Sequence, residues 1–251
     1  PDSSGYFIED NLGLGFRRLS IIDLEAGDQP IFNEDKSVVL MCNGEIFNYL
    51  ELRKNLIQQG HVFRTNSDVE VLLHLYEEDG PGFLNKLNGQ FAFVIYDRKK
   101  KRLFVARDHF GINPLYYTVK DGVFIFASEI KAILEHPAAT REVDLTGLDQ
   151  IFSFPGLVSP RTMFRGIESL KGGNYLTVEN GEIKTVEYWD LDYPTTGELS
   201  YDKPEEYYVE ELKNLFTRST EYRLQSDVPV GFYLSGGLDS SLVTVLAKRL
   251  D

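Results

Sequence analysis

The residues in this sequence that are best suited to chemistry form a short loop between an apolar run and a predicted helix. The loop reads Ser235-Gly236-Gly237-Leu238-Asp239-Ser240 and follows the apolar residues 228–234. Two glycines let backbone N–H groups approach an anion, and the N-terminus of the next helix offers free N–H donors and a positive dipole end. Such a loop could hold a phosphate without a basic side chain. A tight turn with Ser240 or Asp239 as helix N-cap is the alternative interpretation.

The loop differs from two other phosphate-binding patterns. The position after its second glycine does not hold the lysine of a Walker loop, and the third glycine of the dinucleotide fingerprint is missing. The residues do match the pyrophosphate loop of ATP pyrophosphatases, enzymes that release pyrophosphate and transfer AMP to a carboxylate or carbonyl group. This match favours a nucleotide site over a simple turn and cap.

Four other motifs have simpler interpretations when each is taken alone. Asn43-Gly44-Glu45 after an apolar strand is most often a type I′ hairpin turn. Arg18 beside a predicted strand would be a surface cation, and Asp68 would be a first-turn acid favoured by the helix dipole. The run Arg107-Asp108-His109-Phe110-Gly111 would form a loop with its own salt bridge.

The segments that must position these motifs are mostly strands joined by tight turns. Predicted hairpins pair the apolar runs 91–96 with 103–106, 115–119 with 123–127, and 175–178 with 183–189. A buried strand is predicted at 38–42, and helices at 48–59, 67–76 and 128–135. The second helix begins with the capping box Ser67-Asp68-Val69-Glu70. Hairpins with helices gathered between them favour an α+β fold.

The pattern changes after residue 190. Residues 191–198 have no periodicity and contain proline, glycine and two threonines, which is typical of a linker. A helix is predicted to begin at Pro204, followed by a strand at 228–234, the glycine loop and a helix at 240–249. This helix–strand–loop–helix order is how an α/β nucleotide domain begins.

Composition and charge exclude several functions. The net charge of −13 repels nucleic acid and anionic membranes, and no apolar run approaches the length of a membrane span. The histidines His61, His74, His109 and His136 show no metal-ligand spacing, so no metal site is predicted from them. Cys42 is the only cysteine, which fits a reducing compartment such as the cytoplasm.

Taken together and in this order, the motifs resemble those of glutamine-dependent asparagine synthetases. Pro1-Asp2 resembles the end of an Arg-Gly-Pro-Asp element, and the other matches are Arg18-Leu19-Ser20-Ile21, Asn43-Gly44-Glu45-Ile46, Arg107-Asp108-His109-Phe110-Gly111 and Ser235–Ser240. The resemblance implies a class II glutamine amidotransferase half with the fold of N-terminal-nucleophile hydrolases, an αββα sandwich of two antiparallel sheets. The first helix–strand–loop–helix of an α/β ATP-pyrophosphatase domain would follow.

The resemblance also implies roles for individual residues. Arg18 would bind the α-carboxylate of glutamine, the backbone of Leu19, Ser20, Ile21 and Ile22 would line the pocket, and Glu45 and Asp68 would hold the α-ammonium group. The side-chain amide of Asn43 and the N–H of Gly44 would form the oxyanion hole. Leu234, Ser235, Gly236, Gly237, Asp239 and Ser240 would bind ATP.

In the family, ATP with Mg²⁺ adenylates the β-carboxylate of aspartate, and ammonia from glutamine attacks the acyl-adenylate. Residues 1–190 would be the glutaminase domain without its N-terminal segment, 191–203 a linker, and 204–251 the truncated start of the ATP-binding domain. No bound ATP or Mg²⁺ is expected for this stretch by itself, and the resemblance suggests a homodimer.

The catalytic nucleophile of the family is an N-terminal cysteine, and this chain begins after that residue. Cys42 cannot replace it, since it lies inside an apolar strand and has no terminal amine, so it is interpreted as a structural thiol. We therefore expect this stretch alone to be inactive. Two alternatives stay open: a related amidotransferase with another carboxylate acceptor, and a non-catalytic module that binds glutamine or a partner.

Overall fold

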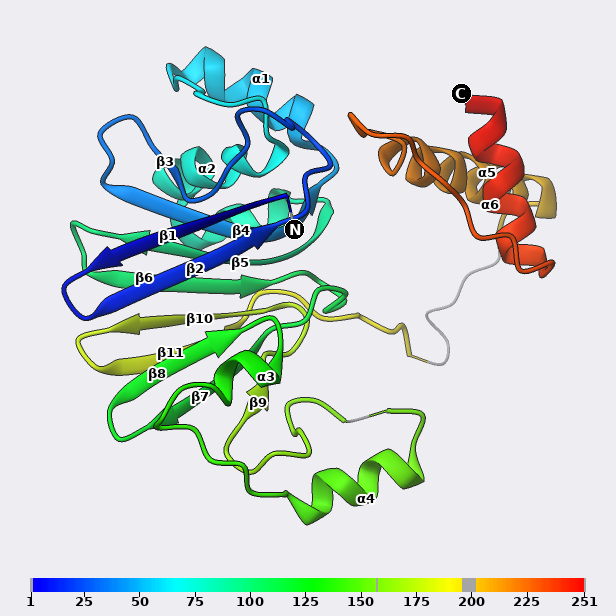
Figure 1. The fold of residues 1–251 in the computed structure, drawn as a ribbon. Helices are drawn as coiled ribbons and strands as arrows, with labels where there is room; N and C mark the ends of the chain where they lie inside the picture. The colour runs from blue at the N-terminus through cyan, green and yellow to red at the C-terminus, as the bar shows by residue number, and fades with distance from the viewer. Residues whose placement is uncertain (1, 157, 196–201, 251) are drawn as a thin grey trace.

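The computed structural model describes residues 2–156, 158–195 and 202–250 (Figure 1). The strands are β1 (Ser3–Glu9), β2 (Leu12–Arg18), β3 (Ile31–Phe32), β4 (Val38–Ile46), β5 (Gly89–Asp97), β6 (Arg102–Arg107), β7 (Tyr116–Lys120), β8 (Val123–Ala127), β9 (Glu168–Ser169), β10 (Asn174–Glu179) and β11 (Glu182–Glu187). The α-helices are α1 (Tyr49–Gln59), α2 (Val71–Asp79), α3 (Ile130–Ile133), α4 (Leu145–Ser153), α5 (Glu205–Tyr222) and α6 (Leu238–Leu250), and the 3-10 helices are η1 (Asp68–Glu70) and η2 (Gly80–Lys86).

A six-stranded antiparallel sheet forms the centre of the molecule, in the order β11-β10-β6-β5-β4-β3. Its longest pairing joins β4 to β5 along their full lengths, from Val38 opposite Asp97 to Ile46 opposite Gly89. Successive side chains of a strand point to opposite faces, and the central strands are apolar on both. Both faces of the sheet must therefore be covered.

One face of this sheet packs against α1, α2 and η2. Its core contains the rings of Phe83, Phe93 and Phe104, whose centroids lie 6.0 to 6.1 Å apart. Leu72 and Leu73 of α2 are fully buried in the same cluster. The helix layer is thus held by apolar packing onto the sheet.

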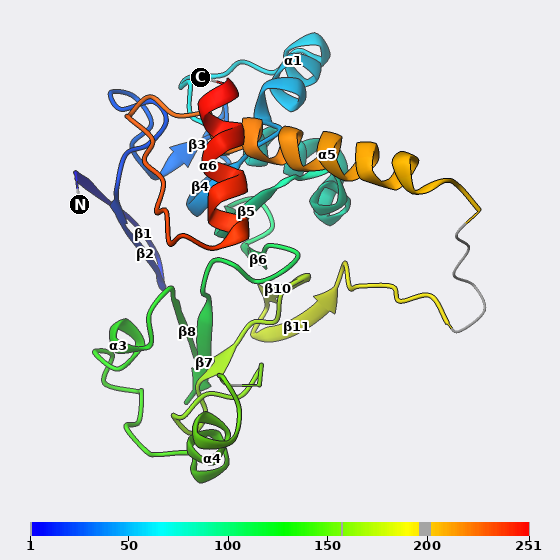
Figure 2. The ribbon, with the colours of Figure 1, turned by 90° about the vertical axis from the view of Figure 1, so that its right-hand side faces the viewer.

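The other face packs against a second strand layer. Val39 and Met41 of β4 share a core cluster with Leu14 of β2 and with Leu115, next to β7. This layer consists of the two-stranded sheet β1-β2 and the three-stranded sheet β8-β7-β9, and α3 lies on its outer side against β7 and β8 (Figure 2). The predicted α+β sandwich of antiparallel sheets is confirmed, with a second layer made of two separate sheets.

Local predictions were correct for the hairpins and less accurate elsewhere. The interpretation of Asn43-Gly44 as a hairpin turn was wrong, because β4 continues through both residues to Ile46. The capping box at Ser67 was also wrong, because the Glu70 carboxylate accepts the backbone N–H groups of Arg64 and Thr65 instead. Helix 128–135 shortens to the four residues of α3.

The C-terminal region has the predicted helices but lacks the strand between them. Residues 228–234 form no strand, and α6 begins at Leu238 rather than at 240. A lone segment without a parallel neighbour has no ladder partners for its backbone, which explains why this apolar run stays irregular. Pro1 and part of the expected linker, residues 196–201, lie outside the described residues. Across the ranges that the structure does describe, no helix is both long and apolar enough to cross a membrane.

Truncating the aromatic core should destabilise the fold. Phe104 of β6 has no exposed surface and contacts the rings of Phe83, Phe93, Tyr76 and Tyr175. Phe104→Ala is expected to lower the free energy of unfolding by about 3–5 kcal/mol, because it removes buried apolar area and leaves a cavity. Urea denaturation followed by circular dichroism would measure the change.

The matched control is Phe152→Ala, since Phe152 is 83% exposed on α4. Its effect should stay within about 0.5 kcal/mol. Equal losses for the two variants would show that the ring cluster does not form the core.

Candidate functional site

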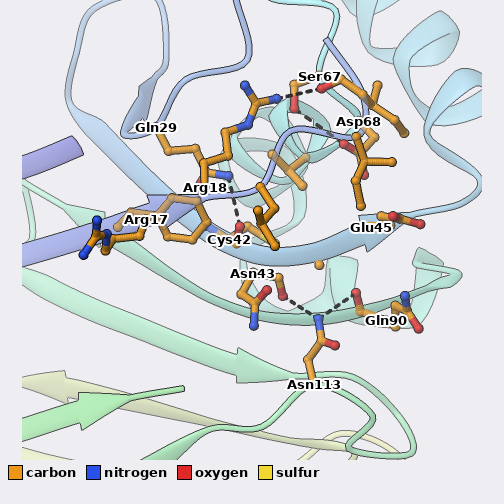
Figure 3. A pocket seen from close by; sticks show the side chains of 16 residues that line it. Arg17, Arg18, Gln29, Cys42, Asn43, Glu45, Ser67, Asp68, Gln90 and Asn113 are labelled. Atoms are coloured by element: carbon orange, nitrogen blue, oxygen red, sulfur yellow. Dashed lines mark hydrogen bonds between the residues drawn. The ribbon is translucent and has the colours of Figure 1, made fainter. Parts of the chain in front are cut away.

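A cavity of about 260 Å³ opens where β2 and β4 end (Figure 3). Eight of the nine residues predicted for the glutamine site line it: Arg18, Leu19, Ile21, Ile22, Asn43, Gly44, Glu45 and Asp68. The ninth, Ser20, does not line it, and its backbone N–H donates to the Asp2 carboxylate at 2.8 Å. Residues widely separated in sequence are thus brought together around one space.

Arg18 is not the surface cation that a local interpretation indicates. It is 6% exposed, and its Nη2 donates to the carbonyl oxygens of Ile22 at 2.6 Å and Asp23 at 2.9 Å. Its Nη1 lies 3.4 Å from the Asp28 carboxylate. The guanidinium group therefore holds the loop after β2 in place while lining the cavity.

Asp23 connects that loop to two distant segments. Its Oδ2 accepts the N–H of Asn66 at 2.7 Å, and its own N–H donates to the Asp227 carboxylate at 2.7 Å. The N–H of Asp227 donates to the carbonyl oxygen of Ile21 at 3.0 Å. The cavity wall therefore includes backbone groups that are bound by the region after α5.

Asp68 supplies a buried carboxylate at the start of η1. It is 4% exposed, and its Oδ2 accepts the N–H of Ile46 at 2.7 Å, which joins η1 to the end of β4. Burial raises the pKa of Asp68; together with the nearby charge of Glu45, and against the backbone hydrogen bond from Ile46, it brings this pKa to about 6. Burial also raises the pKa of Glu45, and the charge of Arg223 opposes that rise. Two carboxylates that are costly to ionise side by side favour a cationic ligand.

Gly44 is required where β4 approaches β5. Its φ is +154°, and a Cβ there would lie 2.2 Å from the carbonyl oxygen of Gln90 and 2.9 Å from Nδ2 of Asn113. No larger residue fits without moving the neighbouring strand. Asn43 beside it is exposed on the cavity, and its carbonyl oxygen accepts from Nδ2 of Asn113 at 2.6 Å.

Asp108 positions the loop that carries Asn113. Its carboxylate accepts the backbone N–H groups of Phe91 at 3.2 Å, Phe110 at 3.1 Å, Ile112 at 2.9 Å and Asn113 at 3.0 Å. Arg107 donates to carbonyl oxygens of the same loop, Gly111 and Asn113, both at 2.6 Å. The predicted salt bridge within this loop is wrong, because each charged group binds backbone instead.

The sequence interpretation missed five polar or charged residues of the cavity lining: Arg17, Gln29, Ser67, Gln90 and Asn113. Gln29 pairs with the backbone of Cys42, accepting its N–H at 2.6 Å and donating to its carbonyl oxygen at 3.0 Å. For Asn113, the sequence offers one signal, which is Asp108 ahead of a short turn. An aspartate side chain often accepts backbone N–H groups two or more residues later, so it can fix the loop that carries Asn113.

The Cys42 side chain belongs to the helix-side core, as predicted for a structural thiol. It is 2% exposed, and burial raises the pKa of its thiol well above the usual range. A thiol that does not ionise at neutral pH is a poor nucleophile.

The predicted nucleotide loop is compact and separate from the cavity lining. The hydroxyl groups of Ser235 and Ser240 lie 2.9 Å apart, and the carbonyl oxygen of Gly237 accepts from the hydroxyls of Ser240 and Ser241 at 3.2 and 2.8 Å. Gly236 has a φ of +83°, a conformation that favours glycine. The other predicted members, Leu234 and Asp239, flank the loop, and Asp239 lies in the first turn of α6.

Comparison with protein-family models matches residues 1–189 to a glutamine amidotransferase domain and residues 211–251 to asparagine synthase. Asparagine synthetase [glutamine-hydrolyzing] 2 of Bacillus subtilis is 41% identical over 99% of this chain and 34% of its own length. Asparagine synthetase B of Escherichia coli is 38% identical over 99% of this chain and 39% of its own. Amidase chyE of Penicillium rubens is 38% identical over 100% of this chain and 37% of its own.

The chain therefore spans 34% to 39% of the length of these curated relatives. Among solved structures, the allosteric regulatory enzyme of purine biosynthesis matches with a TM-score of 0.51 and 23% identity, over 70% of this chain and 35% of that one. This likeness concerns the fold alone.

Asp68→Asn should show that the buried carboxylate reduces stability at neutral pH. Its folded-state pKa of about 6 lies above the ordinary 3.8, so the folded state binds the proton more tightly than the unfolded state does. The free energy of unfolding therefore falls as pH rises from about 4 to 6 and stays lowered above that. Asparagine keeps an oxygen acceptor and removes the charge.

We expect the stability gained by Asp68→Asn to grow by on the order of 2 kcal/mol between about pH 4 and pH 7. Urea denaturation at both pH values would measure it. Asp149→Asn, at an exposed position of α4, is the control and should show no such growth. A constant difference across this range would contradict the raised pKa.

Proposed function

This chain belongs to the glutamine amidotransferase family, and on that premise we propose that the cavity at the ends of β2 and β4 binds glutamine and supports hydrolysis of its side-chain amide. Charge complementarity carries the proposal. A free amino acid presents a carboxylate and an ammonium group on one carbon, and the cavity offers the buried guanidinium of Arg18 together with the carboxylates of Glu45 and Asp68.

The proposed roles follow from those charges. Arg18 binds the α-carboxylate, and Glu45 and Asp68 bind the α-ammonium group, whose charge offsets their mutual repulsion. Leu19, Ile21 and Ile22 form the adjoining wall through their backbone, whereas Ser20, which was predicted with them, does not line the cavity. The Asn43 amide and the Gly44 N–H stabilise the oxyanion of the tetrahedral intermediate, and Asn113 keeps the end of β4 in register for this role.

The attacking group is proposed to be a cysteine at the N-terminus of the mature protein, whose α-amino group acts as its base. Cys42 does not fit that role, because its thiol is buried and its pKa is raised. Cys42 being the only cysteine of the sequence is consistent with the proposed cytoplasmic location.

For the complete protein we propose ATP-dependent transfer of ammonia from glutamine to aspartate, giving asparagine, glutamate, AMP and pyrophosphate. The proposed division is a glutaminase domain at 1–190, a linker at 191–203 and the start of the ATP-binding domain at 204–251. The match of 211–251 to asparagine synthase and the loop at the start of α6 support this division. A homodimer is the proposed assembly.

The loop residues also fit an ATP–Mg²⁺ complex. Mg²⁺ prefers oxygen ligands and shares them with substrate phosphates. The loop offers the Asp239 carboxylate and the hydroxyls of Ser235 and Ser240, and the N-terminus of α6 offers backbone N–H groups for phosphate. This chain's residues would thus hold the pyrophosphate end of the nucleotide.

The alternative is a related amidotransferase that acts on another carboxylate. It is favoured by one finding, since the similar proteins include amidases of fungi as well as asparagine synthetases. Both candidates use the same glutamine site and differ in the acceptor.

Removing the proposed oxyanion donor should slow the chemical step. In the complete protein, Asn43→Ala is expected to lower kcat for glutamine hydrolysis about 100- to 1,000-fold with little change in KM, because the donor acts only in the transition state. Ammonia release from glutamine would measure both constants. Asn55→Ala, at an exposed position of α1, is the matched control. A raised KM with unchanged kcat would assign Asn43 to ground-state binding instead.

The acceptor is tested by AMP formation in the complete protein. Aspartate should stimulate AMP release, and glutamate, one methylene longer, should not. Asp239→Asn is expected to reduce AMP formation at least about 10-fold while glutamine hydrolysis persists, because Asp239 belongs to the nucleotide loop alone. AMP formation that ignores aspartate would exclude the asparagine synthetase assignment and favour another acceptor.

A further inference from the structure

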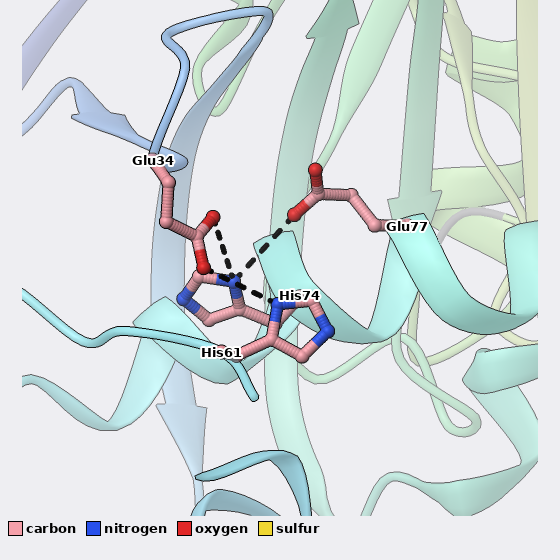
Figure 4. A group of neighbouring side chains, drawn as sticks. All are labelled: Glu34, His61, His74 and Glu77. Carbon is pink, nitrogen blue, oxygen red and sulfur yellow. Dashed lines mark ion pairs between the residues drawn. The ribbon is translucent and has the colours of Figure 1, made fainter. Parts of the chain in front are cut away.

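Four potential metal ligands converge beside α2, outside the glutamine cavity (Figure 4). Glu34 comes from the β3–β4 connection and His61 from the segment after α1, while His74 and Glu77 lie one turn apart on α2. One ligand atom from each lies within 4.8 Å of the others. These residues are scattered along the chain, which is why their spacing in sequence predicted no metal site.

His74 is a buried polar side chain without a satisfied nitrogen. It has no exposed surface, and neither Nδ1 nor Nε2 has a hydrogen-bond partner within the described parts of the chain. Buried polar groups are nearly always paired, so such a ring points to a missing partner. Its Nδ1 faces the carboxylates of Glu34 and Glu77.

Three separations between nitrogen and oxygen atoms of the cluster are longer than typical hydrogen bonds and close to the edge length of a coordination tetrahedron. His61 Nδ1 lies 3.4 Å from Glu34 Oε1, and His74 Nδ1 lies 3.6 Å from Glu34 Oε2 and 3.5 Å from Glu77 Oε2. Hydrogen bonds of this type have a usual length near 2.9 Å. A tetrahedron with metal–ligand bonds of about 2.0–2.2 Å has edges of about 3.3–3.6 Å.

A second set of polar contacts orients these ligands. His61 Nε2 lies 3.1 Å from Glu78 Oε1, which leaves Nδ1 as the free nitrogen directed at the cluster. Glu77 Oε1 accepts from Nδ2 of the buried Asn33 at 2.7 Å, and Glu34 Oε1 accepts the N–H of Val62 at 2.9 Å. Carboxylate partners on the second nitrogen of a ligating histidine are typical of metal sites.

We propose that Glu34, His61, His74 and Glu77 bind one divalent transition-metal cation of the Zn²⁺ class. Two imidazoles with two carboxylates suit Zn²⁺, whereas Mg²⁺ and Ca²⁺ take mainly oxygen ligands. With four protein ligands the site is structural. The ion links the β3–β4 connection and the segment before η1 to α2, and so secures the segment that leads to Asp68. Glu34 and Glu77 are partly exposed and give the ion a path from solvent.

A proton is the competing occupant of the cluster. Burial lowers the pKa of His74, but the carboxylates of Glu70 and Glu77 and the charge of Glu34 outweigh it and raise the pKa to about 9. An imidazolium would be attracted by these three acids and would be faced by the His61 ring, whose centroid lies 4.6 Å away. The experiment must therefore separate metal binding from protonation.

Calorimetric titration with Zn²⁺ of the full chain, free of any histidine tag and stripped by chelator, tests the proposal at about pH 7.5. One Zn²⁺ should bind per chain. His61→Gln and Glu77→Gln should each weaken binding at least about 100-fold, and Glu78→Gln about 10-fold because it only orients His61. His136→Gln, which removes an exposed histidine outside the cluster, is the matched control and should bind as the unmodified chain does.

Co²⁺ gives an independent readout that needs no substitution. The unmodified chain loaded with Co²⁺ should show the intense visible absorption of a tetrahedral complex, and Zn²⁺ should displace it. The proposal would be overturned if Zn²⁺ did not bind stoichiometrically, if His61→Gln bound Zn²⁺ as tightly as the unmodified chain, or if Co²⁺ gave only the weak spectrum of an octahedral complex. A proton would then be the occupant of the cluster. Glutamine hydrolysis is not part of this readout, so its outcome does not depend on the proposed function.

Discussion

The geometry of the cavity at the ends of β2 and β4 depends on one carboxylate that accepts backbone N–H groups. Asp108 is 1% exposed and accepts four such donors, one from β5 and three from the loop that carries Asn113. The donor of the fully buried Phe91 would otherwise lose this partner, and an unpaired buried donor costs roughly 1–3 kcal/mol. Asn113 then fixes the end of β4, where Asn43 and Gly44 lie. These cavity residues are thus positioned by Asp108, which does not itself line the cavity.

The same principle recurs around the cavity, where charged side chains bind mainly backbone groups. Arg18 and Arg107 each donate to loop carbonyl oxygens, and Asp23 accepts the N–H of Asn66. This arrangement lets irregular loops be buried while keeping their polar groups paired. Burial raises the pKa values of both Glu45 and Asp68, and only for Glu45 does a nearby cationic charge, that of Arg223, oppose the rise. A cation entering the cavity would therefore stabilise the ionised form of both carboxylates.

The sequence was sufficient for the parts of the molecule that local patterns encode. Apolar alternation with turn residues predicted the hairpins β5-β6, β7-β8 and β10-β11, and the ordered motifs predicted eight cavity residues. The sequence did not predict long-range strand pairing. Nothing near Asn43 indicates that β4 pairs with β5 through Asn43 and Gly44 and beyond them. Asn113 and the cluster around His74 were missed for the same reason: their partners are distant in the sequence, and spacing alone reports only neighbours.

The bond between Asp23 and Asp227 has a consequence for the order of events on the ribosome. A chain emerges from its N-terminus, and these two residues are separated by 204 positions. All strands of the central sheet leave the ribosome before residue 227 does, so the sheet can assemble first. Until Asp227 emerges, the N–H of Asp23 and the carbonyl oxygen of Ile21 lack their partners in that segment. The cavity wall then reaches its final form only after the segment beyond α5 has been synthesised. Completion of the cavity wall thereby waits for a segment that follows the residues matched to the glutamine amidotransferase domain.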